Sequence, residues 1–304
     1  MGTTKAAFAK EWGYVGKMTS LVSVVVTTYN WPEALSMVLK SLADQKDRNF
    51  EIVIADDGSG DETAQVIKDF AATSAIPVKH YWHEDNGFRV AKARNGAIGL
   101  CEGDLVVFID GDCCVMPDFI TRHRKAATEG CLVSGKRVFL KERLTKTLLA
   151  RKWAFHKWPR PLLFLIALAG FANRPFQFIR LPHNGPWLWE HEKDWQKAQT
   201  CNLGVFKADI DRVQGFDESY EGHGLEDSDF VLRLLRSGLK RKNVEYCSPV
   251  LHLFHKRSDP KRHVEDSKNP SHFKNLLADT ERFLPLTAVK ATSATQKAER
   301  EAAE

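Results

Sequence analysis

The stretch that most constrains the fold of this chain is the apolar run at residues 105–109, which ends abruptly in Asp110-Gly111-Asp112. A continuous hydrophobic run of this kind indicates a parallel strand that is buried on both faces. Ligands of open α/β sheets gather at the carboxyl ends of such strands, so we expect Asp110 and Asp112 to face a crevice. Two carboxylates this close suit Mg²⁺ or Mn²⁺ that substrate phosphates also hold. A turn that caps a helix starting near Pro117 would use the same residues.

The first half of the chain alternates between strand and helix patterns. Strands are predicted at residues 21–28, 50–55, 77–82 and 105–109, and helices at 33–43, 62–72 and 90–101. This alternation predicts an α/β fold in which residues 18–130 form a Rossmann-like lobe with a mostly parallel central sheet. The first strand ends in Thr27-Thr28-Tyr29-Asn30, without the GxGxxG fingerprint, which argues against a nicotinamide dinucleotide.

Composition indicates an ordinary globular protein. Of the 304 residues, 43% are hydrophobic and 27% are charged, and the net charge of +5 favours an anionic substrate or surface. The six cysteines form no CxxC pair, which fits reduced thiols in the cytoplasm and argues against zinc. Residues 1–17 are polar and mixed, so we expect no signal peptide, and Met18 could be the natural start.

A basic segment spans residues 141–180. It carries nine lysines and arginines against the single acid Glu142, and it contains the apolar run 162–171. That run is too short to cross a bilayer, which takes about 20 apolar residues, so it predicts either an interfacial helix or a buried core helix. The polar tail at residues 286–304 is expected to be disordered.

Polar residues follow three of the predicted strands. They are Thr27, Tyr29 and Asn30 after the first strand, Asp56-Asp57-Gly58-Ser59 after the second, and Asp110-Gly111-Asp112 after the fourth. A planar base could stack near Tyr29 while the Asp56 carboxylate accepts its ring N–H. The Asp-Asp-Gly-Ser stretch is also a good turn sequence in its own right.

Basic residues open the predicted helix at 90–101. Guanidinium groups and a helix N-terminus both suit phosphate, which makes Arg89, Lys92 and Arg94 candidates. Arg89 and Lys92, three residues apart, would share one helix face. Solvated surface charge is the alternative for each of them.

In the second half, Glu226-Asp227-Ser228-Asp229 precedes a run with amphipathic helical spacing. The helix dipole favours anions there, so these acids could act as bases or could simply cap the helix. Further on, His252 and His255 offer two imidazoles, of which one could reach a metal.

In this order, the motifs at residues 24–30, 55–59, 110–112 and 226–227 resemble those of glycosyltransferase family 2 enzymes with the GT-A fold, over residues 21–256. The resemblance implies that Thr27, Tyr29 and Asp56 hold uracil, with Asn30 beside them. It implies that Arg94, or Arg89 as second choice, contacts the pyrophosphate. Asp110-Gly111-Asp112 would be the DxD motif, in which Asp112 ligates Mn²⁺ or Mg²⁺ directly and Asp110 bridges to the nucleotide.

The C-terminal part is similar to the corresponding region of β-1,4-galactosyltransferases. The resemblance implies an acceptor-binding lobe at residues 131–285, in which Asp227 is the base, Glu226 grips the acceptor and His255 binds the metal. The chain departs from the pattern in having His252 at the neighbouring ligand position. It also has Gly222-His223-Gly224 where a tryptophan-glycine run is common.

These features predict an inverting enzyme that moves galactose, glucose or an N-acetylhexosamine from a UDP-sugar to a glycan. We expect a role in bacterial lipopolysaccharide, capsule or other surface polysaccharide synthesis, in the cytoplasm, with the basic segment touching anionic membrane and no nucleic-acid partner. A nucleotidyltransferase acting on a sugar phosphate is one alternative, although residues 29–32 form no glycine-rich loop. A non-catalytic glycan-binding protein of the same fold is the other.

Overall fold

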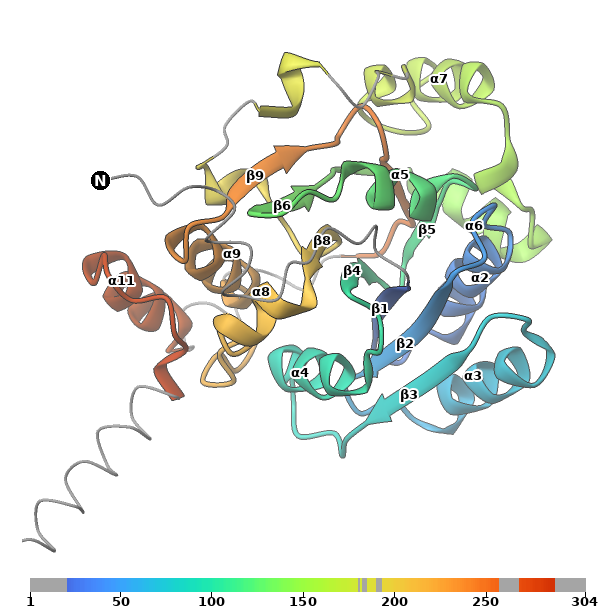
Figure 1. Ribbon diagram of the computed structural model, residues 1–304. Helices are drawn as coiled ribbons and strands as arrows, with labels where there is room; N and C mark the ends of the chain where they lie inside the picture. The colour runs from blue at the N-terminus through green and yellow to red at the C-terminus, as the bar shows by residue number, and fades with distance from the viewer. Residues whose placement is uncertain (1–20, 180, 182–184, 190–192, 257–267, 288–304) are drawn as a thin grey trace, which may run out of the picture.

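The computed structural model describes residues 21–179, 181, 185–189, 193–256 and 268–287 (Figure 1). The expected strand and helix alternation of the first half is confirmed. Its elements are β1 (Val22–Thr28), α2 (Pro32–Ala43), β2 (Phe50–Asp56), α3 (Asp61–Thr73), β3 (Val78–Trp82), α4 (Val90–Leu100) and β4 (Leu105–Asp110).

The remainder of the chain is built from shorter elements. The strands are β5 (Cys113–Val115), β6 (Cys131–Ser134), β7 (Arg137–Phe139), β8 (Asn202–Phe206), β9 (Lys240–Asn243) and β10 (Val250–His252). The α-helices are α5 (Phe119–Ala126), α6 (Glu142–Arg151), α7 (Arg160–Leu168), α8 (Lys207–Arg212), α9 (Glu226–Arg236) and α11 (Asn269–Ala278). The 3-10 turns are η1 (Phe155–Lys157), η2 (Pro175–Phe178), η3 (Pro186–Trp189) and η4 (Trp195–Lys197).

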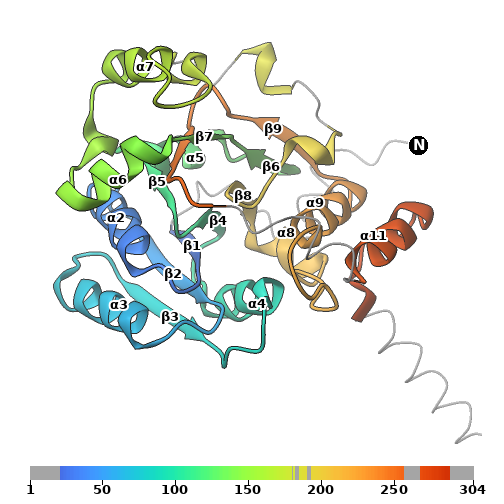
Figure 2. The ribbon, with the colours of Figure 1, turned by 180° about the vertical axis from the view of Figure 1, so that it is seen from behind.

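One seven-stranded sheet in the order β3-β2-β1-β4-β8-β6-β9 forms the centre of the molecule (Figure 2). Its first four strands are parallel, and β8 runs antiparallel to both neighbours. The parallel register places Thr28 beside Asp56 and Thr27 beside Asp110, so the polar strand ends meet at one edge of the sheet. A smaller sheet, β5-β10-β7, lies beyond this edge and pairs Cys113 with His252.

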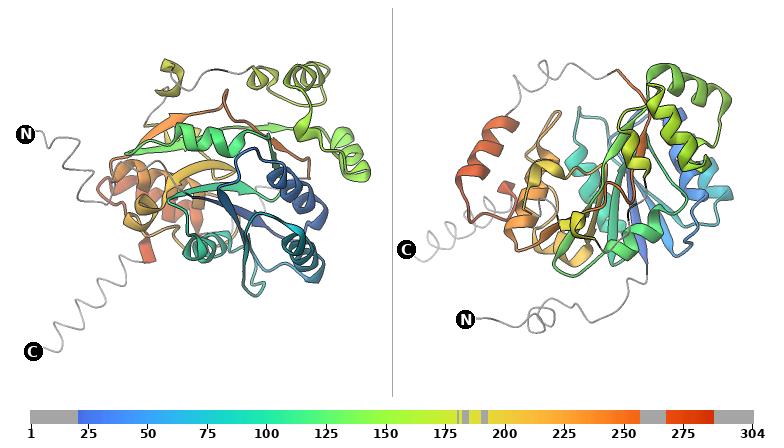
Figure 3. Two further views of the ribbon diagram at one scale, coloured as in Figure 1. Left: turned by 45° about the vertical axis from the view of Figure 1, so that its right-hand side comes forward. Right: turned by 90° about the horizontal axis from the view of Figure 1, so that it is seen from above.

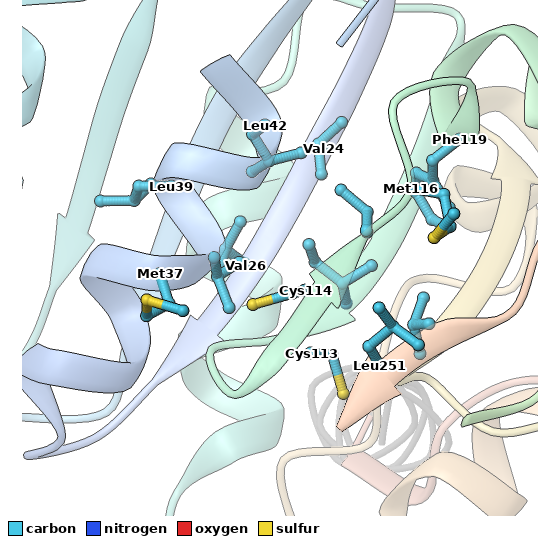
Figure 4. Close-up of a cluster of buried hydrophobic side chains, with 14 of the residues drawn as sticks. Val24, Val26, Met37, Leu39, Leu42, Cys113, Cys114, Met116, Phe119 and Leu251 are labelled. Carbon is cyan, nitrogen blue, oxygen red and sulfur yellow. The ribbon is translucent and has the colours of Figure 1, made fainter. Parts of the chain in front are cut away.

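Helices cover both faces of the large sheet (Figure 3). Side chains alternate along β1, so Val24 and Val26 pack with the α2 residues Leu39 and Leu42 (Figure 4), while Val25 belongs to the core on the α4 and α9 side. Burial on both faces explains why these strands read as continuous apolar runs.

The sheet continues across the expected boundary at residues 130 and 131, because β4 pairs with β8 and β8 pairs with β6. Among the described residues, no helix is both long enough and apolar enough to cross a membrane. Residues 1–17 and Met18 lie outside the described residues, as does the expected tail apart from Leu286 and Thr287.

Candidate active site

A cavity of about 1020 Å³ lies where the carboxyl ends of β1 and β4 face the smaller sheet. Eight of the residues predicted from the sequence line it: Thr27, Tyr29, Arg94, Asp110, Asp112, Glu226, Asp227 and His255. Four others, Asn30, Asp56, Arg89 and Gly111, do not. Polar residues that line the cavity without a role predicted from the sequence include Asp57, Arg137, Cys201 and His223, and His252 lines it together with His255.

Asp56 and Asp57, at the end of β2, are both buried but differ in their access to the cavity and in the direction of their pKa shifts. Asp56 is fully buried; Ser59 N donates to its Oδ1 at 2.8 Å, and His80 Nε2 lies 3.0 Å from its Oδ2. Burial opposes ionisation of Asp56, but the contacts with His80 and Ser59 outweigh it and lower the pKa. Asp57 lines the cavity and accepts the backbone N–H of Arg89 at 3.0 Å, and burial raises its pKa.

The other residues that stay outside the cavity lining support its shape. Asn30, with φ of 46°, accepts the N–H of Gly60 through Oδ1 at 2.9 Å and so holds the two strand ends together. Gly111 donates its N–H to Thr27 O at 2.7 Å, and a Cβ there would approach that oxygen to 2.9 Å, so the turn requires glycine. Arg89 pairs with Glu221 at 2.9 Å.

Arg94, on α4, links the two groups of acids that line the cavity. The guanidinium is buried; it donates to Thr27 Oγ1 at 3.3 Å and to Glu226 Oε1 at 3.1 Å, and it lies 3.7 Å from Asp110 Oδ1. Its carbon lies 5.3 Å from the ring centre of Phe216. The side chain is therefore fixed between the end of β4 and the start of α9.

Arg137, on β7, is a second guanidinium at the cavity. It donates to Asp110 Oδ2 at 3.4 Å, and its buried Nε has no hydrogen-bond partner in the part of the chain that the structure describes. Burial and the neighbouring Asp112 together raise the pKa of Asp110, against the attraction of Arg94 and Arg137. Sequence reasoning missed Arg137 because a three-residue strand carries no recognisable pattern.

Asp112 lies between two histidines that β10 and the residues after it bring to the cavity. The Nε2 atoms of His252 and His255 are each 3.3 Å from Asp112 Oδ2, and the ligand atoms of Asp112, Cys113 and His252 lie within 4.8 Å of one another. Burial opposes ionisation of Asp112, but the His255 hydrogen bond and the charge of His252 outweigh it and lower the pKa. The hydrogen bond that His255 donates to Asp112 raises the pKa of His255.

The acid pair at the start of α9 forms another wall. Leu225, with φ of 75°, turns the chain into the helix, and Arg94 holds Oε1 of the buried Glu226. Glu226 Oε2 is buried and has no hydrogen-bond partner among the described residues. Burial, reinforced by Glu226, raises the pKa of Asp227 to about 6. Asp229 instead pairs with the fully buried Arg233 and does not line the cavity.

The Gly222-His223-Gly224 loop places an imidazole at the cavity wall. Gly222 and Gly224 have φ of 78° and 101°, a conformation that glycine adopts without strain. The His223 ring lies 5.3 Å from that of Phe88, and Asn269 donates to Gly224 O at 3.0 Å. The loop is thus fixed from α11.

The mostly parallel sheet with a cavity at its carboxyl edge has the arrangement of the GT-A fold. Residues 23–181, more than half of the chain, match the family model described as glycosyl transferase family 2, so the chain belongs to that family. Residues 183–256 match a model described as the N-terminal domain of galactosyltransferase.

Curated relatives support this assignment. Validoxylamine A glucosyltransferase of Streptomyces hygroscopicus subsp. jinggangensis is 31% identical over 242 residues, which cover 72% of this chain and 52% of that protein. Chondroitin synthase of Escherichia coli is 23% identical over 239 residues, 74% of this chain and 33% of that one. The chain therefore spans about half the length of the glucosyltransferase and about a third of the length of the chondroitin synthase.

Solved structures confirm the predicted GT-A fold. The mannosyltransferase PcManGT from Pyrobaculum calidifontis, in complex with GDP-Man and Mn²⁺, superposes with a TM-score of 0.54 at 17% identity, over 83% of this chain and 64% of that one. TarS 1-349 of S. aureus, in complex with UDP-GlcNAc, gives a TM-score of 0.51 at 16% identity, over 78% and 59%.

Proposed function

We propose that this protein transfers a hexose from a UDP-sugar to a hydroxyl group of a glycan, with inversion at the anomeric carbon. The observation that carries the proposal is that Asp110 and Asp112, which suit a divalent cation that a nucleotide diphosphate also holds, share one cavity with Glu226 and Asp227. Arg94 contacts both groups of acids. A donor and an acceptor could therefore meet between them.

At the donor end, the base would stack against Tyr29, which is half exposed and lines the cavity. We assign the carboxylate that accepts the ring N–H to Asp57 rather than to Asp56. Both carboxylates have partners, Asp56 in Ser59 and His80 and Asp57 in the Arg89 N–H and His83, but only Asp57 lines the cavity. Thr27, which also lines the cavity, would lie between these base-binding residues and the diphosphate.

The diphosphate would be held by Arg137 together with Arg94. Arg94 already contacts the carboxylates of Asp110 and Glu226, so its main role would be to position these two acids. Arg137 contacts a single acid at 3.4 Å and keeps a buried N–H without a partner. A guanidinium with unused donors suits phosphate oxygens.

The donor set around Asp112 fits a divalent metal. Asp112, His252 and His255 would hold it, with Cys113 close by and Asp110 reaching toward the nucleotide. Imidazole nitrogens favour Mn²⁺ over Mg²⁺, which prefers oxygen ligands alone. When bound, such an ion neutralises charge on the departing diphosphate.

Asp227 would act as the general base. As the bond from the acceptor oxygen to the anomeric carbon forms, the bond from that carbon to the phosphate oxygen breaks, and its electron pair leaves with UDP. The proton of the attacking hydroxyl passes to Asp227. The unpartnered Oε2 of Glu226 can accept a hydrogen bond from a second hydroxyl group of the glycan. In-line attack from the opposite side inverts the anomeric configuration.

Bacterial surface polysaccharides are the proposed setting. Two relatives are named chondroitin synthase and poly(ribitol-phosphate) beta-N-acetylglucosaminyltransferase TarS. Both names describe glycosyl transfer, and the acceptors differ. The hexose could be galactose, glucose or an N-acetylhexosamine, since a single contact to the sugar can decide between them.

The test is a panel of UDP-hexoses assayed for UDP release, with the wild type and Asp227→Asn compared on the best donor. We expect Asp227→Asn to bind UDP normally and to lose about 10²–10⁴-fold in turnover. Asp211→Asn, exposed on α8, is the matched control. Wild-type turnover in Asp227→Asn would refute the base. Formation of a nucleotide-sugar from a sugar phosphate, or glycan binding without turnover, would replace the proposal.

The metal assignment has its own test. Titration calorimetry of UDP with and without Mn²⁺ should show metal-dependent affinity that Asp112→Ala abolishes and His252→Ala weakens. Unchanged affinity in both variants would contradict the ligand set.

A further inference from the structure

A group of apolar side chains on α7 and η2 faces solvent. On α7, Leu163 and Ala167 pack into the core, while Leu162, Leu165 and Leu168 are exposed, Leu165 by 60%. Spacings of three residues place these leucines on one helix face. The α7–η2 surface, as we name it, consists of Leu162, Leu165, Leu168, Phe171, Phe176 and Ile179, all of them exposed.

This surface lies at the outer edge of the molecule, away from the seven-stranded sheet (Figures 1 and 2). Phe164 of α7 packs edge-on against Phe176 of η2, with ring centres 6.1 Å apart, which joins the two elements. The surface is therefore built on the folded protein rather than on a loose loop. Exposed apolar patches of this kind mark sites of interaction.

The segment that carries the surface begins and ends at the wall of the active-site cavity. Leu140 forms a β-bridge with Ala172, and Lys141 N donates to Phe171 O at 2.8 Å. Lys141 and Asn173, on either side of the excursion, both line the cavity. Whatever binds the α7–η2 surface is consequently held beside the cavity.

The segment that carries the surface is strongly basic, and two of its cations pair with acids of other elements, Lys157 with Asp44 and Arg160 with Asp118. Seven exposed cations lie within the described residues 141–179: Lys141, Arg143, Lys146, Arg151, Lys152, Lys157 and Arg174. Glu142 is the only acid of that stretch, and it pairs with Lys146. Trp153 is exposed, packs 6.0 Å from Trp158 and carries the Arg151 guanidinium over its ring at 5.2 Å.

We propose that the α7–η2 surface docks on an anionic phospholipid bilayer, with its leucines and phenylalanines among the acyl chains and the cations at the headgroups. Apolar side chains flanked by basic residues and tryptophan are suited to the membrane interface. Through the proposed function, on which this consequence rests, docking would bring the cavity to glycans carried on lipids. The docking itself does not depend on the transfer reaction.

A second copy of the chain is the competing occupant. Self-association through this surface by a two-fold axis would place the same patch against itself. Two copies of this basic segment would then be brought together, which costs energy, whereas anionic lipid attracts the segment. Charge complementarity therefore favours the bilayer.

Flotation with phosphatidylcholine vesicles, with and without phosphatidylglycerol, tests the proposal on the full chain. We expect binding to the anionic vesicles only, and at least a tenfold loss of partitioning in Leu165→Asp/Phe176→Asp, because two side chains can no longer be buried. Arg151→Gln/Lys152→Gln should lose about fivefold per charge. Leu277→Asp, on α11 and 44% exposed, is the matched control.

Three outcomes would overturn the proposal. The first is that the wild type does not bind anionic vesicles. The second is that the Leu165→Asp/Phe176→Asp variant binds them as well as the wild type does. The third is that sedimentation shows a wild-type dimer that dissociates in this variant, while the wild type does not bind vesicles. UDP release from the soluble donor, measured without vesicles, should be unchanged in both surface variants. Failure of docking is thereby distinguished from failure of the proposed function.

Discussion

Asp227 and Glu226 are adjacent acids that their surroundings make unequal. Arg94 holds one oxygen of Glu226, whereas Asp227 faces the cavity with its pKa raised to about 6 by burial and by the Glu226 charge. A base with a pKa near the working pH combines a large ionised fraction with strong proton affinity. The environment therefore favours Asp227 for proton transfer and Glu226 for binding.

The pH dependence of the reaction follows from this pair. Because only ionised Asp227 can accept a proton, we expect kcat/KM to fall about tenfold per pH unit below pH 6. Glu226→Gln removes the neighbouring negative charge, so the pKa of Asp227 and the acidic limb should move to lower pH. Steady-state rates from pH 4.5 to 8 measure this, with Glu102→Gln, far from the cavity, as control. An acidic limb that stays in place would contradict the coupling.

Asp56 and Asp57 should separate stability from binding. Asp57→Asn keeps one oxygen that can accept the Arg89 N–H, but it replaces the charged oxygen that would accept the ring N–H of the base with an amide. A hydrogen bond to a charged group is worth about 1.5–3 kcal/mol. We expect UDP to bind at least tenfold more weakly, with a smaller loss of Tm than in Asp56→Asn, because the amide oxygen can keep the Arg89 N–H although the His83 pair is weakened. Asp56→Asn should lower Tm, because its buried carboxylate joins Ser59 and His80. Calorimetric titration and thermal unfolding measure both, and the reverse pattern would restore Asp56 as the base-reading residue.

At the scale of elements, the sequence predicts those helices and strands whose residues show a local hydrophobic pattern. Apolar runs and helical spacing located β1 through β4 and the acidic turns after them. The β5-β10-β7 sheet was not predicted, because its three-residue strands pair Cys113 with a residue far along the chain, His252. That pairing is what brings a second histidine to Asp112. Likewise, the geometry of a single turn decides that Asp57 rather than Asp56 faces the cavity.

The loop at residues 222–224 should depend on α11. Asn269, at the start of α11, accepts Glu221 N–H at 3.2 Å and donates to Gly224 O at 3.0 Å. We expect Asn269→Ala to speed hydrogen exchange in residues 221–224 at least tenfold, because these contacts hold left-handed backbone in place. Exchange mass spectrometry measures it, with the exposed Asn275→Ala on the same helix as control. Unchanged exchange would show that the loop holds itself.

At the scale of the whole molecule, donor and acceptor sides share one structural unit. The two family models meet near residue 182, yet β6 from the first pairs with β8 and β9 from the second. Phe108 of β4 contacts Phe216 and Phe230, whose rings stack with centres 4.0 Å apart. The predicted boundary after residue 130 therefore falls within one continuous sheet.

Cooperative unfolding should follow from this shared core. Phe216 is buried between β4 and α9, and removing a buried phenylalanine costs about 3–5 kcal/mol. We expect Phe216→Ala to lower the free energy of unfolding by that amount, and the denaturant midpoint with it, while β1 and β8 still lose exchange protection together. Phe283→Ala, 38% exposed, should shift it little. If β8 lost protection while β1 remained folded, the two halves would be separate units, and Arg94 could not hold the acid pair against the nucleotide site.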